Sequence, residues 1–422
     1  MNKIFKKIIS VTAIITLCLC FAGCSLFIGA DKGDINNLPN SMSLGANVTF
    51  DSQSSETRKL MSRADAVDMV ARSVVAIENV YNYNGKTVSA YGSGVIINDT
   101  TSTDGKSFFI ITCHHVIASG GEVVVYVPDN NGRNFTDDDY NTDYSFTGVI
   151  GSASKGAITL VGGDKDSDIA VLRLNISDKT VDIKAAKIPA NDYKVRLGEE
   201  IFTIGNPSGQ LPMTVMTGCI SYIRREAVIG GVGFMDLYQI DAAINHGNSG
   251  GGLFNLYGEL IGITNAGNDE YYCLNYAIPF EGENGFINVA KQLIATATEN
   301  NYGFVSGRWE FGVSIKDKAV GVGTCVVVET VQQNSNAAKA GVNVGDVIIA
   351  LKYVKDGKEE TFDIASSTDF SLAFYDMKKT VQIGDSFVVV VQRNYSQTVS
   401  ITINITEQFI FCDTGYYPTG NK

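Results

Sequence analysis

Short apolar runs rich in β-branched and aromatic residues recur along the chain, and turns that contain glycine, asparagine or aspartate separate them. Residues 108–112, 168–174 and 387–391 are three such runs, and each has the length of a strand rather than of a helix. The chain has 422 residues with 43 glycines, which suits a β core with many turns. The pattern therefore predicts a mainly β protein with more than one folded domain.

Helical spacing of apolar residues is confined to a few segments. Residues 64–72 show it, and they begin the folded part of the chain. A second segment, 291–307, begins as a helix and ends at Gly303 and Gly307, as a connection between domains would. We therefore expect one domain over residues 62–295 and another over residues 307–408.

The N-terminus has the pattern of a signal peptide. Three lysines within residues 1–7 precede the apolar stretch 8–22, which is too short to span a membrane comfortably. The stretch leads into Phe21-Ala22-Gly23-Cys24, which resembles a bacterial lipobox. Residues 1–23 are thus predicted to be a lipoprotein signal peptide, with lipidation of Cys24 after cleavage. A plain secretory signal or an uncleaved anchor is the alternative.

Residues 24–61 are rich in serine, asparagine, glycine and aspartate and have no apolar period. This composition predicts a flexible tether that holds the folded part away from a bilayer. Together with the predicted lipid, it indicates an extracytoplasmic protein attached to the bacterial cell membrane.

Charge and cysteine content narrow the class of protein. The formal net charge is −12 and no basic patch is present, which argues against nucleic acid as a partner. Eight cysteines are present, of which three lie in the signal peptide and lipobox. The other five form no zinc or disulfide spacing, so we interpret them as mostly buried thiols, with one disulfide bridge as the alternative. We expect no metal and no cofactor. They are Cys113, Cys219, Cys273, Cys325 and Cys412.

The run Gly247-Asn248-Ser249-Gly250-Gly251 places a small nucleophile on a turn bracketed by glycines. Such a turn exposes the serine hydroxyl and lets backbone N–H groups converge where an oxyanion would form. The run also fits the G-x-S-x-G pattern of α/β-hydrolases, so it does not define the fold by itself.

Histidine separates these alternatives. The chain has three, His114, His115 and His246, and all of them precede Ser249. An α/β-hydrolase needs its catalytic histidine after the serine, whereas a chymotrypsin-like protease has the order His, Asp, Ser. The sequence therefore predicts a serine protease of the chymotrypsin type.

The other two catalytic residues are predicted from the strands beside them. His115 follows the strand-like run 108–112 and is the expected base, whereas His114 would point to the opposite side. Asp168 begins the run 168–174 and is expected to accept a hydrogen bond from the His115 ring. Asp164 and Asp166 lie in a polar loop, where we expect solvated side chains.

Five blocks in this order resemble the HtrA/Deg family of serine proteases. They are Thr112–Val116, Ser167–Leu172, Ile204–Pro207, Asp241–Gly251 and Tyr276–Pro279. The resemblance implies a double β-barrel with the catalytic triad in the cleft between the barrels. It also implies an oxyanion hole formed by the backbone N–H groups of Gly247 and Ser249, with Asn248 between them.

The chain departs from the family pattern in three places. Cys113 and His114 precede the catalytic histidine, where small or amide residues are usual, and His246 precedes the glycine turn. His246 either perturbs the oxyanion turn and makes it sensitive to pH or is an ordinary loop histidine. The acidic segment 137–143 is either simply solvated or has a regulatory or calcium-binding role.

Specificity follows from the resemblance. Ala243, six residues before the serine, corresponds to the base of the primary pocket, and Thr264 and Asn265 to one wall. An uncharged residue at the bottom of the pocket implies cleavage after small or medium aliphatic residues, with loose discrimination among them.

The C-terminal region resembles a PDZ domain, the module that follows the protease domain in this family. Residues 336–348 contain a short alanine helix, a glycine stop and a Gly-Asp turn into a strand. Phe311, Gly312 and Val313 match the loop that binds a peptide carboxylate, after which the peptide adds a strand to the sheet. A small structural β domain without peptide binding is the alternative, and the sequence does not locate the neighbouring helix.

The combined expectation is a mainly β chain with a chymotrypsin-like double β-barrel protease domain and a PDZ domain. It would be a lipid-anchored serine endopeptidase that cleaves unfolded or misfolded extracytoplasmic proteins and binds peptide C-termini. The resemblance implies a homotrimer. The alternatives are a catalytically restrained PDZ adaptor or chaperone-like binding protein, and a narrow regulatory signalling protease.

Overall fold

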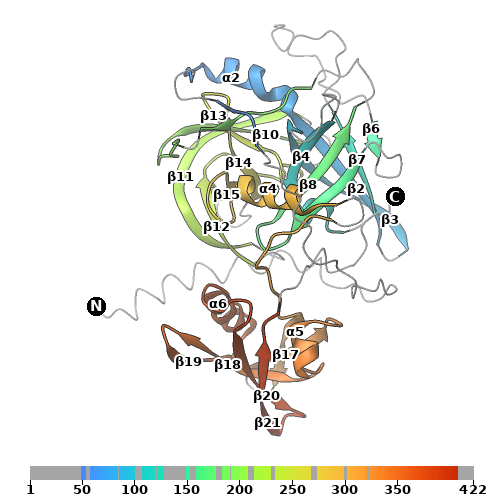
Figure 1. Cartoon of the computed structure of the whole chain (residues 1–422), viewed down its shortest axis with the longest axis vertical. Helices are drawn as coiled ribbons and strands as arrows, with labels where there is room; N and C mark the ends of the chain where they lie inside the picture. The colour runs from blue at the N-terminus through green and yellow to red at the C-terminus, as the bar shows by residue number, and fades with distance from the viewer. Residues whose placement is uncertain are drawn as a thin grey trace. The chain divides into compact units, whose positions relative to one another are not determined.

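The computed structural model describes two units, each with its own core (Figure 1). Unit 1 comprises Met1–Phe304 with Phe411–Lys422, and unit 2 comprises Val305–Ile410. The division after Phe304 falls inside the connection expected between residues 295 and 307. The described residues are 49–53, 58–83, 85–99, 107–119, 121–127, 149–152, 158–176, 183–190, 192–207, 213–229, 233–267, 273–298, 302–320 and 323–406.

The first sheet of unit 1 has seven antiparallel strands in the order β6-β5-β2-β3-β4-β8-β7. Its core includes the fully buried Ile77, Ile96 and Phe109. The strands are β2 (Val74–Tyr83), β3 (Lys86–Asn98), β4 (Ser107–Cys113), β5 (Glu122–Tyr126), β6 (Val149–Ser152), β7 (Ile158–Asp164) and β8 (Ile169–Asn175). Strands β4 and β8 confirm the two strand predictions in this region.

The second sheet closes into a barrel in the order β10-β11-β12-β15-β14-β13. Phe202 and Phe254 stack inside it, with 5.5 Å between ring centroids. The strands are β10 (Glu200–Gly205), β11 (Thr214–Ile229), β12 (Gly233–Ile240), β13 (Gly252–Asn255), β14 (Leu260–Gly267) and β15 (Asn275–Pro279). Two β modules confirm the predicted trypsin-like architecture, although among the strands that the structure describes only this sheet forms a closed hydrogen-bonded ring.

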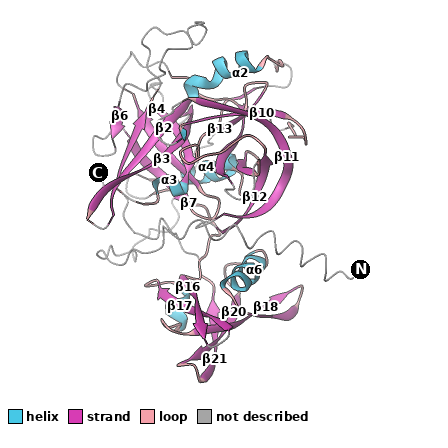
Figure 2. Ribbon diagram, turned by 180° about the vertical axis from the view of Figure 1, so that it is seen from behind, coloured by secondary structure: helices cyan, strands magenta, loops and turns pink. Residues whose placement is uncertain are grey.

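The described residues of unit 1 contain few helices (Figure 2). They are α2 (Arg63–Val70), the 3₁₀ turn η2 (Ala71–Ser73), α3 (His114–Ile117) and α4 (Phe286–Thr296). Helix α4 contacts β7 and β8 and buries Phe286, Val289 and Leu293. Among the described residues, none of the helices combines the length and the apolar character needed to cross a bilayer.

The predicted tether is wrong at its C-terminal end. Phe50 is buried, and β1 (Ser52–Gln53) pairs in parallel with β9 (Ile188–Pro189). Arg58 Nε lies 2.9 Å from Oε1 of the fully buried Glu259. These contacts attach the chain to unit 1 well before residue 62, although its composition is polar. Residues 1–48, the lipidation site Cys24 and the acidic segment 137–143 lie outside the described residues.

Unit 2 is a sheet in the order β16-β17-β18-β20-β21, with β19 paired to β18, and it packs against two helices. The strands are β16 (Val313–Val320), β17 (Gly323–Val331), β18 (Val347–Lys355), β19 (Lys358–Asp363), β20 (Ser386–Arg393) and β21 (Gln397–Asn404). The helices are α5 (Asn336–Ala340), which Gly341 ends, and α6 (Ser367–Lys378). Helix α6 contacts β16 and β18, and it is the helix that the sequence did not locate.

Candidate active site

His115 is held by the end of strand β4. The strand ends at Cys113, and the single turn of α3 follows at once. His114 is buried, whereas 41% of the His115 side chain is exposed, so consecutive histidines occupy different environments as predicted. The His115 ring is thus fixed at its base and open to a substrate.

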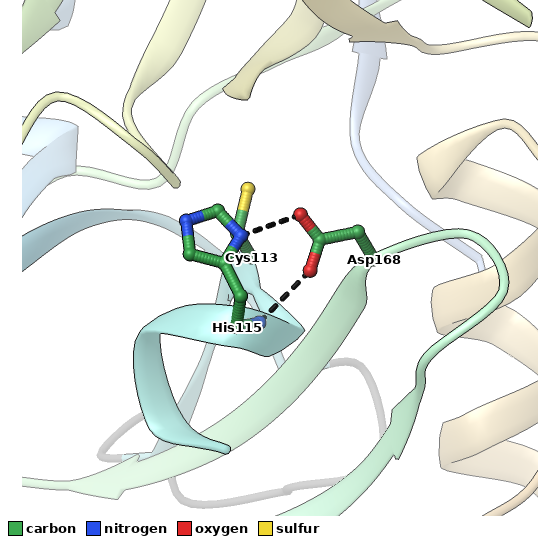
Figure 3. Close-up of side chains that lie close together, drawn as sticks. All are labelled: Cys113, His115 and Asp168. Carbon is green, nitrogen blue, oxygen red and sulfur yellow. Dashed lines mark hydrogen bonds and ion pairs between the residues drawn. The ribbon is translucent and has the colours of Figure 1, made fainter. Parts of the chain in front are cut away.

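Asp168 stands immediately before β8, in the left-handed region with φ 54°, and its side chain is fully buried. Oδ2 lies 2.6 Å from His115 Nδ1, and Oδ1 accepts the His115 backbone N–H at 2.8 Å (Figure 3). The expected hydrogen bond between the two side chains is therefore present. Asp164 is buried rather than solvated, because its carboxylate accepts the backbone N–H and the hydroxyl of Ser167.

The pair has shifted pKa values. Burial lowers the pKa of His115, but the charge and hydrogen bond of Asp168 outweigh it, so the pKa rises above its ordinary value of 6.5. Burial raises the pKa of Asp168, but His115 outweighs it and the net shift is downward. Asp168 thus stays ionised and holds the proton on Nδ1, which leaves Nε2 of the neutral ring free to act as a base.

Hydrogen bonds from Ser93 hold the turn that carries Ser249. Ser93 donates its hydroxyl to the Gly247 carbonyl at 2.8 Å and its backbone N–H to the Ser249 carbonyl at 2.8 Å. Gly250 has φ 86°, and a Cβ there would overlap the Ser93 carbonyl oxygen. A glycine is therefore required at this position, and the turn keeps one shape.

The Ser249 hydroxyl donates a hydrogen bond to the Asn265 carbonyl at 2.8 Å. For attack on a substrate, the hydroxyl must rotate away from β14 so that His115 Nε2 can accept its proton. Catalytic hydrogen bonds are often incomplete before substrate binds, so this geometry fits a resting enzyme.

The residues predicted for specificity lie in different environments. Ala243 and His246 are exposed, whereas the side chains of Thr264 and Asn265 are buried. The Thr264 hydroxyl donates to the Asn248 carbonyl at 2.5 Å. Because these side chains are buried, Thr264 and Asn265 can contact a substrate only through the backbone of β14.

Sequence reasoning missed Ser93 altogether and missed the contact of Asn265 with Asp168, because it placed Asn265 only in the wall of the specificity pocket. Ser93 supports the serine turn, and the Asn265 amide Nδ2 donates to Asp168 Oδ2 at 2.6 Å. Asn265 therefore shares Oδ2 with the His115 ring, while Oδ1 accepts the His115 backbone N–H. Ser93 belongs to no motif, and no signal in the sequence pointed to the contact between Asn265 and Asp168.

Cys113 lies beside the pair. Its thiol is fully buried, donates to the Thr264 carbonyl at 3.3 Å, and has a pKa well above its ordinary value because of burial and the Asp168 charge. The expectation of mostly buried thiols is wrong for the other described cysteines. Cys219 and Cys325 are half-buried, Cys273 is exposed, and all four are free thiols.

Comparisons with known proteins agree with this geometry. The model of a trypsin-like peptidase domain matches residues 92–263. The serine endoprotease DegS of Haemophilus influenzae is 32% identical over 65% of this chain and 72% of its own length. A probable periplasmic serine endoprotease DegP-like of Brucella suis is 32% identical over 62% of this chain and 44% of its own length, so this chain spans less than half of that relative.

The similarity is not confined to unit 1. The serine protease Do-like HtrB of Bacillus subtilis is 30% identical over 82% of this chain and 71% of its own length. Because 82% of the chain is more than unit 1 contains, the match extends into unit 2.

Proposed function

Because the chain belongs to the HtrA/Deg family of trypsin-like serine endoproteases, we propose that Ser249, His115 and Asp168 are its catalytic residues. The observation that carries this assignment is the 2.6 Å contact between His115 Nδ1 and Asp168 Oδ2 next to the Ser249 turn. The chain is a serine endopeptidase, and the similarity to named endoproteases does not favour a restrained adaptor.

The proposed mechanism follows from these positions. Ser249 Oγ forms a bond to the carbonyl carbon of the substrate while His115 Nε2 takes its proton. The backbone N–H groups of Gly247 and Ser249, on either side of Asn248, stabilise the oxyanion. His115 then gives the proton to the leaving amine, and a water molecule hydrolyses the acyl-enzyme with His115 again as base.

We propose that the substrates are unfolded or misfolded proteins. The exposed and uncharged Ala243 supports a primary pocket for small or medium aliphatic residues, which folded proteins bury. Casein and a reduced, unfolded disulfide protein should be cleaved, whereas the native form of the same disulfide protein should stay intact. Equal cleavage of both forms would exclude selection for unfolded chains.

The pH dependence of activity tests the proposed base. Only neutral His115 can accept the serine proton, and its pKa is raised above 6.5 by Asp168. Activity should thus rise as the pH increases through a midpoint above 6.5 and be lost below it. We expect kcat/KM for a fluorogenic peptide to show this limb and Asp168→Asn to move it to lower pH. A midpoint below 6.5 in the unmodified enzyme would contradict the assignment.

We further propose that unit 2 is a PDZ domain that binds peptide C-termini. Strand β16 is an edge of its sheet, and the loop before it contains Gly312 with φ 82°. Phe311 is 2% exposed and packs against Phe370 and Phe387 of the core, so it would meet a peptide through its backbone. Val313 begins β16, along which the peptide would add a strand.

Gly312→Ala should abolish most of this peptide binding. A Cβ at this position would overlap Ser335 Cβ, and φ 82° is strained for alanine, so the carboxylate loop must move. We expect Kd for a hydrophobic C-terminal peptide to rise by about tenfold or more in a titration by fluorescence anisotropy. Gly357→Ala is the matched control, because Gly357 has φ 75° but its Cβ would meet nothing within 4 Å. Equal Kd values for the two variants would argue against the site.

We propose that the enzyme is an extracytoplasmic homotrimer attached to the cell membrane through lipid on Cys24. Support comes from the lipobox-like sequence and from the periplasmic description of a relative. Cys24→Ser should release the protein from the membrane fraction, and sedimentation of a soluble form should give three times the monomer mass. Retention of Cys24→Ser in the membrane would favour an uncleaved anchor.

A further inference from the structure

We propose that Cys113, His115, Asp168 and Asn265 form an inhibitory binding site for Zn²⁺ or a similar thiophilic divalent cation. Binding at this site would not depend on the proposed protease function, whereas the inhibitory effect rests on it. The cation would bind Nδ1 of His115, whereas Nε2 of the same ring is the atom that accepts the Ser249 proton.

Distance and ligand type both fit such a cation. The ligand atoms of Cys113, His115 and Asp168 all lie within 4.8 Å of one another, and Figure 3 shows the sulfur near Nδ1. Thiolate, imidazole and carboxylate are the three ligand types that zinc binds in proteins. With bonds of about 2.0–2.3 Å, ligands of one tetrahedral zinc lie about 3.3–3.8 Å apart. The His115 Nδ1–Asp168 Oδ2 pair, 2.6 Å apart, would therefore have to open to admit the cation.

Charge also balances at this position. A Cys113 thiolate and the Asp168 carboxylate together carry two negative charges, which one divalent cation neutralises inside a buried site. The thiol proton leaves to solvent when the cation binds, and the His115 proton moves from Nδ1 to Nε2. No oxidation or reduction takes part in the step.

Asn265 supplies a fourth ligand. Its Nδ2 contacts both Asp168 Oδ2 at 2.6 Å and Cys113 Sγ at 3.7 Å. The residue is only 1% exposed, and its Oδ1 has no hydrogen-bond partner among the described residues. Rotating the amide by half a turn would bring Oδ1 to the place of Nδ2, where an oxygen can bind the cation. A buried carbonyl oxygen without a partner is costly, and the cation would satisfy it in exchange for the Nδ2 hydrogen bond to Asp168.

Occupancy of this site would stop catalysis. A cation on Nδ1 replaces the hydrogen bond to Asp168 and leaves the ring proton on Nε2, which then cannot accept the Ser249 proton. Mg²⁺ and Ca²⁺ prefer six or more oxygen ligands and should not bind. Inhibition should therefore be selective for thiophilic cations.

Binding is tested in the Ser249→Ala background, so that activity plays no part. Co²⁺ serves as the probe, because a cobalt–thiolate bond gives a charge-transfer absorption band and tetrahedral cobalt has intense visible bands. We expect these bands in Ser249→Ala and in its combination with Cys325→Ala, a control in unit 2. They should disappear when Cys113→Ala is added. Absence of the bands from Ser249→Ala, or bands unchanged by Cys113→Ala, would overturn the proposal.

Inhibition is tested separately on the active enzyme. Zn²⁺ should inhibit peptide cleavage, a chelator should restore it, and Mg²⁺ at the same concentration should have no effect. Relative to its own metal-free rate, Cys113→Ala should need at least about tenfold more Zn²⁺ for half inhibition than Cys325→Ala. Equal half-inhibition in the two variants would reject the site. If Cys113→Ala fails to fold by circular dichroism, Cys113→Ser replaces it in both measurements. If the enzyme has no activity, the proposed function is contradicted, but the cobalt bands still show whether the cation site exists.

Discussion

Ser249→Ala is expected to lower kcat for casein cleavage by about 10⁴- to 10⁶-fold. The hydroxyl is the only group on its turn that can form the acyl-enzyme, while the hydrogen bonds from Ser93 keep the turn in shape without it. The loss should appear in kcat with little change in the circular dichroism spectrum or in the thermal unfolding midpoint.

The matched control for this substitution is Ser89→Ala, because Ser89 is exposed on β3. It should retain full activity. Folded Ser249→Ala that kept more than about a hundredth of the activity would show that another nucleophile is in use.

Asp168→Asn has the second largest expected effect, a fall in kcat of about 10⁴-fold. The carboxylate accepts from His115 Nδ1, from the His115 backbone N–H and from Asn265 Nδ2. An amide in its place presents an N–H toward one of these donors and favours the wrong tautomer of the ring. The measurement is kcat for a fluorogenic peptide at a pH well above the pKa of His115.

Asp166→Asn provides the comparison, since Asp166 lies two residues away and outside the His115 pair. Its kcat should stay within a few-fold of the unmodified enzyme. A loss smaller than tenfold for Asp168→Asn would remove this carboxylate from the mechanism.

The pairing of His115 with Asp168 was predictable from sequence because both residues lie at strand ends. In the structure β4 and β8 are antiparallel neighbours with Cys113 opposite Ile169, so the residues next to these two meet. The β pattern predicted a mainly β chain, whereas the double β-barrel was implied by the resemblance to the family. Residues at the ends of neighbouring strands can therefore be paired from the positions of their motifs in the sequence.

Contacts between distant segments were not predictable in this way. Asn265 meets Asp168 across 97 positions, and Ser93 meets Gly247 across 154, so only the packing of the two sheets brings them together. The start of unit 1 was also missed, because β1 is a two-residue strand in a polar segment.

Helix α6 did carry a local signal. Ser366 accepts the Asp369 N–H at 3.1 Å and donates its hydroxyl to the Asp369 carboxylate at 2.8 Å. A serine followed by an acid three residues later is the capping pattern of a helix start. The pattern was legible in the sequence, but the mixed aromatic and polar residues that follow it obscured the helix.

Reaction with a fluorophosphonate probe tests the central claim most directly, because the probe modifies only a serine that a neighbouring base has activated. Mass spectrometry of the labelled protein should place the adduct on Ser249 in the unmodified enzyme and find none in His115→Ala. A folded enzyme that stays unlabelled, even with hydrophobic C-terminal peptides added, or that carries the adduct on another serine would contradict the account.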